Sequence, residues 1–147
     1  MKKIISHRGN LEGSNKELEN NPNYIMNAVN FGYDVEIDVW YFNENYYLGH
    51  DMPKYKIDLN FLKNNNFWCH AKNFKALENM LKNNIHCFWH ENDSATITSK
   101  KIPWCYPNNY IDSGITVVLE KTDSIFKYNF TGICTDYPNY YSTLLKI

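Results

Sequence analysis

The segment GYDVEIDVW, residues 32–40, has the pattern of a β-strand with two different faces. Apolar and acidic side chains alternate along it, and successive side chains of a strand point to opposite faces. One face would carry Val35, Ile37 and Val39. The other would carry Asp34, Glu36 and Asp38. The alternation therefore predicts a strand over residues 33–40.

Glu36 and Asp38 are the first candidates for chemistry. Two carboxylates separated by one residue on a strand point the same way, and they repel each other unless a cation lies between them. Mg²⁺ and Ca²⁺ take oxygen ligands of this kind. We interpret the pair as ligands of a divalent cation. The alternative is the solvated face of an edge strand.

Apolar periodicity and turn residues predict further elements on both sides of this strand. A helix is expected over residues 22–31, because Pro22 suits its first position and Gly32 ends it. Other helices are expected over residues 74–83 and 140–145. The remaining expected strands span residues 2–6, 46–48, 67–72, 85–90, 102–106, 115–120 and 132–135.

The order of these elements favours one α/β domain over residues 1–147. Strands that alternate with helices in the first half indicate parallel βα units, whereas the second half is denser in strands and poorer in helices. A complete (β/α)₈ barrel takes about 250 residues, more than this chain has. The expected fold is therefore a shortened, incomplete TIM-like (β/α) barrel with some helices missing.

Composition excludes several classes of function. The net charge of −1 gives no basic footprint for nucleic acid. No apolar run approaches the roughly 18 residues of a membrane span, and the N-terminal apolar run is too short for a signal peptide, so we expect a cytoplasmic protein. The cysteines are not paired as CxxC and read as small buried hydrophobic residues, with a disulfide or metal framework as the alternative: Cys69, Cys87, Cys105 and Cys134.

Polar side chains cluster where the expected strands end. In parallel α/β folds these strand ends share one rim, where active sites are built. Histidines at such positions can serve as general acid and base, and Arg8, the only arginine in the chain, suits an anion. The clustered pairs are His7 with Arg8, Glu36 with Asp38, His50 with Asp51, His70 with Lys72, and His90 with Glu91.

Several of these motifs resemble the glycerophosphodiester phosphodiesterase family. The motifs are HRG at residues 7–9, EN at 19–20, GYDVEIDVW at 32–40 and YYLGHD at 46–51, with TGICTDYP at 131–138 similar to the closing strand motif of that family. The resemblance implies a TIM-barrel fold and a phosphoric diester hydrolase that uses a divalent metal. It also implies roles: His7 and His50 as the acid–base pair, Arg8 and Lys72 on the phosphate, and Glu36 and Asp38 on the metal with Glu19 nearby.

One motif departs from the family pattern. The third-strand motif of the family is typically Glu-x-Lys, whereas this chain has CHAK at residues 69–72, so that Lys72 remains and His70 replaces the glutamate. We interpret His70 as a metal-site residue, with a substrate contact or a supporting hydrogen bond as alternatives. Mg²⁺ or Ca²⁺ is still the expected metal, but an imidazole ligand makes Mn²⁺ or Zn²⁺ alternatives.

The segment HCFWHENDSATITSKKIPWCYP, residues 86–107, is similar to a short bacterial subgroup of this superfamily that tends to be encoded beside surface-polysaccharide genes. This similarity implies a polyol-phosphate or glycan-linked diester, with roles in lipid metabolism or polysaccharide biosynthesis. His90 and Glu91 would then bind substrate opposite His7. Three tryptophans would form either a pocket wall or part of the core: Trp68, Trp89 and Trp104.

The resulting hypothesis is a metal-dependent phosphodiester hydrolase that acts on a glycerol-, polyol- or glycan-linked diester. Two alternatives stay open at this point. One is a lyase that stops at a cyclic phosphate. The other is a degenerate, non-catalytic barrel that binds a phospho-glycan or a protein partner.

Overall fold

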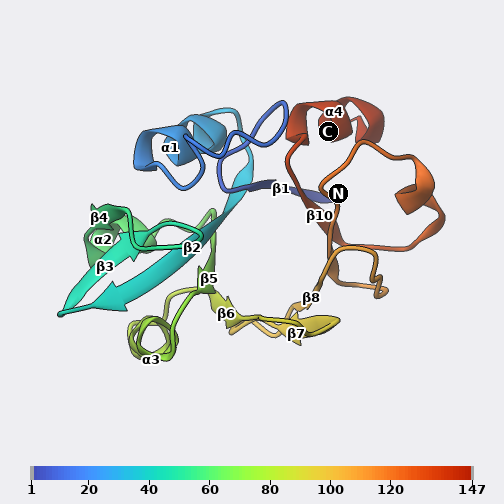
Figure 1. Cartoon of the computed structure of the whole chain (residues 1–147). Helices are drawn as coiled ribbons and strands as arrows, with labels where there is room; N and C mark the ends of the chain where they lie inside the picture. The colour runs from blue at the N-terminus through green and yellow to red at the C-terminus, as the bar shows by residue number, and fades with distance from the viewer. Residues whose placement is uncertain (1, 147) are drawn as a thin grey trace.

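The alternating segment becomes β2 (Asp34–Phe42), the strand around which the sheet is organised. The computed structural model describes residues 2–146, and its centre is a curled mixed sheet of ten strands (Figure 1). Strand β2 pairs in parallel with β1 (Lys3–His7) on one side and with β5 (Phe67–Ala71) on the other. Its C-terminal half also pairs antiparallel with β3 (Asn45–Leu48), so β2 contacts three neighbours.

The remaining strands extend the sheet in both directions from β2. The order along the main path is β4-β3-β2-β1-β10-β9-β8-β7, while β5 joins β2 to β6. Two pairings besides β2 with β3 are antiparallel, namely β3 with β4 and β7 with β8. The added strands are β4 (Tyr55–Ile57), β6 (Cys87–Trp89), β7 (Ala95–Ile97), β8 (Pro103–Cys105), β9 (Ile115–Val117) and β10 (Gly132–Thr135).

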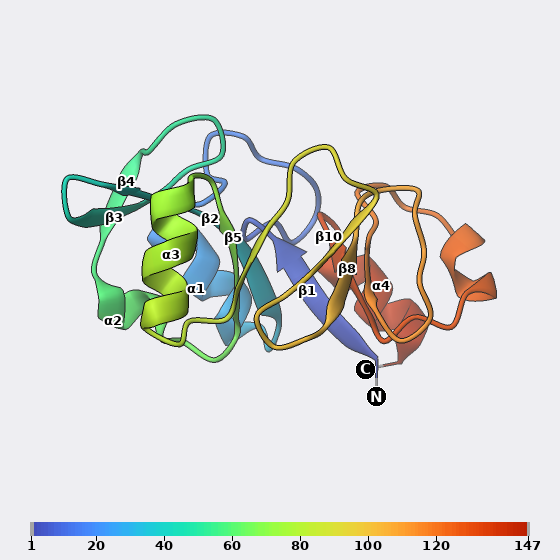
Figure 2. The same ribbon diagram turned by 90° about the horizontal axis from the view of Figure 1, so that it is seen from below.

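Parallel pairing brings distant residues to one end of the sheet. The register aligns His7 with Glu36 across β1 and β2, and Asp38 with His70 across β2 and β5. Figure 2 shows the sheet from the side, with both chain termini near the end at which β1 begins. The C-terminal ends of the parallel strands therefore meet at the opposite end, where the polar residues lie.

Strand β2 is buried on both faces. Val35, Ile37 and Val39 are fully buried against α1 (Pro22–Asn30) and α3 (Phe74–Lys82). On the opposite face the side chains point into the curl, and Glu36 is 3% exposed while Asp38 is 0% exposed. The alternative of a solvated edge strand is therefore wrong, and the acidic face needs an explanation other than solubility.

Asparagine caps begin the two long helices that cover the outside of β2. The Asn21 side chain accepts hydrogen bonds from the backbone N–H groups of Asn23 and Tyr24, and Pro22 occupies the first turn of α1. The Asn73 side chain accepts from the backbone N–H of Ala76 in the same way at the start of α3. The remaining helices are α2 (Leu59–Leu62), the 3₁₀ helix η1 (Ser124–Lys127) and α4 (Pro138–Leu145).

The expected shortened TIM-like barrel is wrong. The sheet is mixed, because β3, β4 and β7 add antiparallel pairs, and only 23% of the described residues are helical. Among the described residues no α-helix lies between β6 and β9, and only the short η1 lies between β9 and β10. The chain is too short to place a helix after every strand, so the second half extends the curled sheet with short strands and loops.

Other differences from the sequence-based expectations are local. Residues 92–101, for which neither a helix nor a strand was expected, contain β7, and β4, α2 and η1 were not expected either. The four cysteines are free and buried, which confirms their expected role as small hydrophobic residues. None of the helices between residues 2 and 146 combines the length and the apolar composition that a bilayer span requires.

The buried side chain of His86 should make the stability of the folded protein depend on pH. The residue is 8% exposed, its ring centroid lies 4.4 Å from that of Trp68, and its Nε2 atom has no hydrogen-bond partner within residues 2–146. Burial, followed by the positive charge of Lys100, lowers the pKa of His86 to about 4. Between about pH 6.5 and pH 4 the unfolded chain therefore binds a proton that the folded protein does not, so stability falls as the pH falls.

The substitution His86→Phe should remove this contribution. The free energy of unfolding should be measured with urea at pH 7.5 and at pH 4.5. Between these pH values the wild type should lose about 1–2 kcal/mol more of it than the variant does. This difference is smaller than the full pKa shift implies, because solvent screens the lysine charge. Parallel losses in the two proteins would contradict this assignment.

Candidate active site

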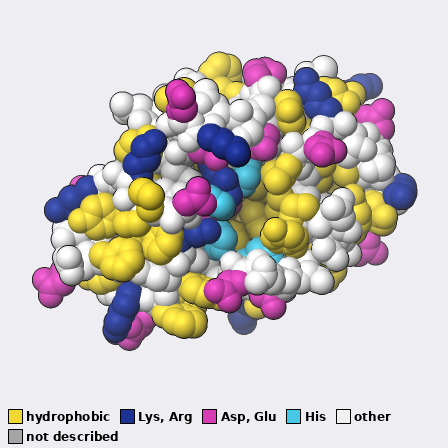
Figure 3. Space-filling model, viewed as in Figure 1, with side chains coloured by type: hydrophobic (Ala, Val, Ile, Leu, Met, Phe, Trp, Pro, Cys, Tyr) yellow, Lys and Arg dark blue, Asp and Glu magenta, His cyan; other side chains and the backbone are white. Residues whose placement is uncertain are grey.

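A cavity of about 500 Å³ opens where the parallel strands end. Figure 3 shows this hollow at the centre of the curled sheet, with histidine side chains beside hydrophobic ones. Four of the five histidines line it: His7, His50, His70 and His90.

The structure brings all ten expected site residues to this cavity. Nine of them line it directly: His7, Arg8, Glu19, Glu36, His50, His70, Lys72, His90 and Glu91. The tenth, Asp38, lies beneath the lining residues and contacts three of them, Arg8, His70 and Lys72. Their roles in binding or catalysis stay predictions.

Asp38 is the most heavily contacted side chain of the site. Its Oδ2 accepts a 2.8 Å hydrogen bond from the Asn20 side chain and lies 3.0 Å from Arg8 Nε. Its Oδ1 lies 3.1 Å from His70 Nδ1 and 3.6 Å from Lys72 Nζ. Burial alone would raise the pKa of Asp38, but the hydrogen bond from His70 and the charge of Arg8 outweigh burial and hold this pKa below its usual range. Asp38 is therefore ionised.

Arg8 connects Asp38 to a second carboxylate. Its Nη1 donates a 3.0 Å hydrogen bond to Glu19 Oε2, while Nε forms an ion pair with Asp38 that is not aligned as a hydrogen bond. The backbone of Arg8 is left-handed, with φ of 57°, and Gly9 follows with φ of 91°. This sharp turn at the end of β1 holds the guanidinium at the edge of the cavity, where its side chain is 18% exposed.

Glu36 differs from Asp38 in having too few partners. It is buried, and its Oε2 atom has no hydrogen-bond partner among the described residues. Burial, followed by the charge of Asp38, raises the pKa of Glu36. A cation placed against this oxygen would reverse both effects, because it would compensate the buried negative charge.

His70 faces hydrogen-bond acceptors with both ring nitrogens. Its Nε2 lies 2.9 Å from the His90 carbonyl oxygen, so this nitrogen carries the proton of that hydrogen bond. Its Nδ1 lies 3.1 Å from Asp38 Oδ1 and 3.8 Å from Glu36 Oε1. Burial would lower the pKa of His70, but the hydrogen bond to Asp38 and the two carboxylate charges raise it. In this arrangement Nδ1 holds either a proton or a metal ion.

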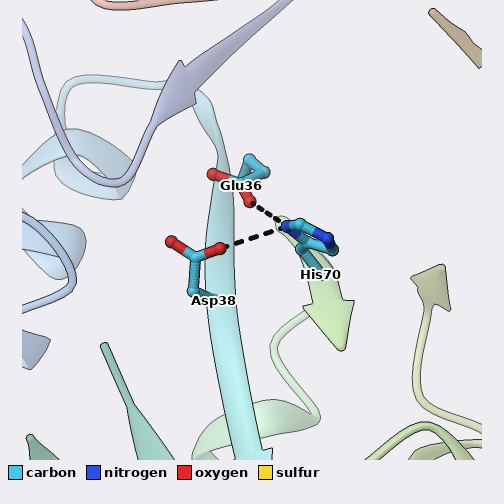
Figure 4. Close-up of side chains that lie close together, drawn as sticks. All are labelled: Glu36, Asp38 and His70. Atoms are coloured by element: carbon cyan, nitrogen blue, oxygen red, sulfur yellow. Dashed lines mark hydrogen bonds and ion pairs between the residues drawn. The ribbon is translucent and has the colours of Figure 1, made fainter. Parts of the chain in front are cut away.

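Glu36, Asp38 and His70 together can hold a metal ion. Figure 4 shows the two carboxylates of β2 facing the imidazole of β5, and one donor atom from each residue lies within 4.8 Å of the others. Oε1 is the Glu36 oxygen that faces His70, and the unpartnered Oε2 of the same carboxylate leaves a buried negative charge that such an ion would compensate. The hydrogen bond from His70 Nε2 to a carbonyl also fits, because histidine ligands usually donate their other ring N–H in this way. Glu19 hydrogen bonds to Arg8, Asn10 and Ser14 instead.

His7 is oriented by a carboxylate that the sequence-based analysis missed. Its Nδ1 donates to Asp136 Oδ1 over 2.7 Å, and the same oxygen accepts from the Asn10 side chain over 2.8 Å. The Nε2 atom of His7 then lies 4.0 Å from Glu36 Oε2. Asp136 follows β10, so the pairing of β10 with β1 places it beside His7. The signal for it was present in the TDYP motif, which the resemblance included without a role for Asp136.

His50 reaches the cavity from the loop after β3. Its Nδ1 lies 2.7 Å from Asp51 Oδ1, and its side chain is 42% exposed. Burial, followed by the positive charge of Arg8, lowers the pKa of His50. Both candidate catalytic histidines therefore have Nδ1 on a carboxylate, which leaves Nε2 as the nitrogen available to a ligand.

Comparisons with known proteins add nothing to this geometry. No protein-family model, no curated protein and no solved structure matches the chain.

The substitution Asp136→Asn tests the orientation of His7. An asparagine amide can donate to Nδ1, so the variant should move the His7 proton from Nδ1 to Nε2, as with other histidines that lose an orienting carboxylate. Ring ¹⁵N chemical shifts in long-range proton–nitrogen spectra distinguish the two tautomers. An unchanged His7 tautomer in a folded variant would show that Asp136 does not set it.

Proposed function

We propose that the protein is a cation-assisted phosphodiesterase, a phosphoric diester hydrolase with His7 and His50 as its acid–base pair. The observation that carries the proposal is that two carboxylate-oriented histidines line the same cavity as the basic side chains Arg8 and Lys72. The resemblance of residues 4–51 and 131–138 to glycerophosphodiester phosphodiesterases supports the same chemistry. The fold lends no support, so the proposal depends on the side chains.

Arg8 and Lys72 would hold the phosphate. The contacts of Arg8 with Glu19 and Asp38 use Nη1 and Nε, which leaves the Nη2 group for an anion. Lys72 Nζ has a loose 3.6 Å ion pair with Asp38, and its side chain is 17% exposed in the cavity wall. Both groups can stabilise the negative charge that grows on the equatorial phosphate oxygens during cleavage.

A bound cation would complete the charge balance. When all are ionised, five carboxylates at the cavity outnumber its three basic groups by two; the carboxylates are Glu19, Glu36, Asp38, Glu91 and Asp136, and the basic groups are Arg8, Lys16 and Lys72. A phosphodiester anion would be repelled by this excess while the histidines are neutral. A divalent cation held by Glu36, Asp38 and His70 would neutralise phosphate oxygens and polarise a hydroxyl group.

The two histidines would move the protons. His7 would accept a proton at Nε2 from the attacking group, while Asp136 stabilises the resulting imidazolium. The attacking group is a water molecule, or a neighbouring substrate hydroxyl whose cyclic phosphate product is then opened by water. His50 would donate a proton from Nε2 to the departing alcohol oxygen. Its lowered pKa makes protonated His50 a stronger acid, which suits this role. A non-catalytic binding module would need neither group.

Single alanine substitutions test the pair. Wild type, His7→Ala and His50→Ala should be assayed against glycerol-, choline- and nucleotide-linked diesters with Mg²⁺, Ca²⁺, Mn²⁺ or a chelator. Each variant should lose at least about a hundredfold in turnover, because an acid–base group contributes roughly 10²–10⁴. Phosphorus NMR of the products separates complete hydrolysis from a lyase that stops at a cyclic phosphate.

A matched control is His86→Phe, which changes a buried histidine that directly precedes β6 and does not line the cavity. This variant should keep wild-type turnover. Near-normal rates in both alanine variants would contradict the assignment. Phosphate binding without turnover by the wild type under any of these conditions would instead favour the binding module.

A further inference from the structure

His90 is a buried polar side chain in the wall of the cavity. Only 9% of its surface is exposed, and neither Nδ1 nor Nε2 has a hydrogen-bond partner among the described residues. The residue follows β6 and lines the cavity. Buried polar groups in folded proteins are almost always paired, so a ring with two unpaired nitrogens in a cavity wall points to a ligand.

The structure holds this ring in one place. The His90 carbonyl oxygen accepts the hydrogen bond from His70 Nε2, which fixes the backbone next to the candidate metal ligands. The ring packs against Tyr106, with centroids 5.0 Å apart and planes 59° apart. A neutral imidazole in this position offers one N–H donor and one acceptor lone pair to the cavity.

The neighbours of His90 indicate what kind of group fits there. Glu91 and Asn92 follow it along the chain and also line the cavity, and they add a carboxylate and an amide. Tyr106 is 47% exposed and supplies an aromatic ring with a hydroxyl group. The carboxylate of Glu91 disfavours a second anionic group, whereas hydroxyl groups can pair with every one of these side chains.

We propose that His90, Glu91, Asn92 and Tyr106 form a subsite for a hydroxyl-rich ring, a hexose or cyclic polyol, that is esterified to the phosphate. This inference rests on the proposed function, because that function assigns the phosphate itself to Arg8 and Lys72. The ring hydroxyls pair with the His90 nitrogens, and the apolar ring face lies against Tyr106. A choline group has neither donors nor acceptors and would leave both nitrogens unpaired.

Hydrogen-bonding subsites of this kind discriminate strongly between substrates that carry the matching hydroxyl groups and substrates that lack them. A site built to bind a substrate hydroxyl rejects an analogue without it, because its buried polar groups then stay unpaired. We therefore expect the wild type to cleave glycerophosphoinositol at least tenfold more efficiently than glycerophosphocholine, as judged by kcat/KM. These diesters share the glycerophosphate half and differ only in the second alcohol.

The test is the substitution His90→Phe, which keeps a planar ring beside Tyr106 and removes both nitrogens. It should lower kcat/KM for glycerophosphoinositol at least tenfold and change that for glycerophosphocholine less than threefold. His86→Phe, the same substitution at the other end of β6, should leave the ratio of the two substrates unchanged. Equal losses on both substrates, or no loss on either, would overturn the inference.

A binding experiment separates this inference from the proposed function. Free myo-inositol at millimolar concentration should shift the His90 ring signals in proton–nitrogen spectra of the wild type, and the His90→Phe variant should bind it more weakly. If no diester is cleaved but this binding is seen, the subsite stands and the proposed function fails. If diesters are cleaved but myo-inositol leaves the His90 signals unchanged, the subsite fails and the proposed function stands.

Discussion

The site depends on one buried negative charge, the Asp38 carboxylate. A fully buried carboxylate is costly unless charged or hydrogen-bonding groups surround it. Asp38 has four such partners, and they come from three separate parts of the chain: Arg8, Asn20, His70 and Lys72. Because an uncompensated buried charge costs about 3–5 kcal/mol, these groups are held in place by the stability of the fold itself. The basic residues that face the cavity are therefore positioned before any ligand binds.

Glu36 and Asp38 lie two residues apart on one strand, but their surroundings give them different properties. Arg8 and His70 keep the pKa of Asp38 low, whereas burial and the charge of Asp38 keep that of Glu36 high. The Asp38 charge is therefore compensated by the protein, and the Glu36 charge is not. Glu36 is therefore the carboxylate whose charge a bound cation would compensate. It lies next to Nε2 of His7.

Much of this site could be predicted from sequence because strand ends in a parallel sheet meet at one rim. The alternation over residues 33–40 was enough to place Glu36 and Asp38 on one face, and histidines at other strand ends then came to the same cavity. The pairing of His7 with Asp136 joins residues 129 positions apart, so no local pattern could assign it. The fold class was wrong for a different reason. The antiparallel additions are local hairpins that join β2 with β3, β3 with β4 and β7 with β8. Strands β4 and β7 have only three residues each, which is too short for apolar alternation to reveal them, so the mixed character of the sheet was missed.

The proposed function requires that a cation and a phosphate bind together in the cavity around Asp38. Crystals grown with Mn²⁺ and glycerol 3-phosphate test this requirement, because anomalous scattering locates the manganese. We expect a manganese peak bonded to Glu36, Asp38 and His70, with the phosphate between His7 and the basic groups of Arg8 and Lys72. A cavity without manganese at these three residues, or a phosphate bound elsewhere on the protein, would contradict it.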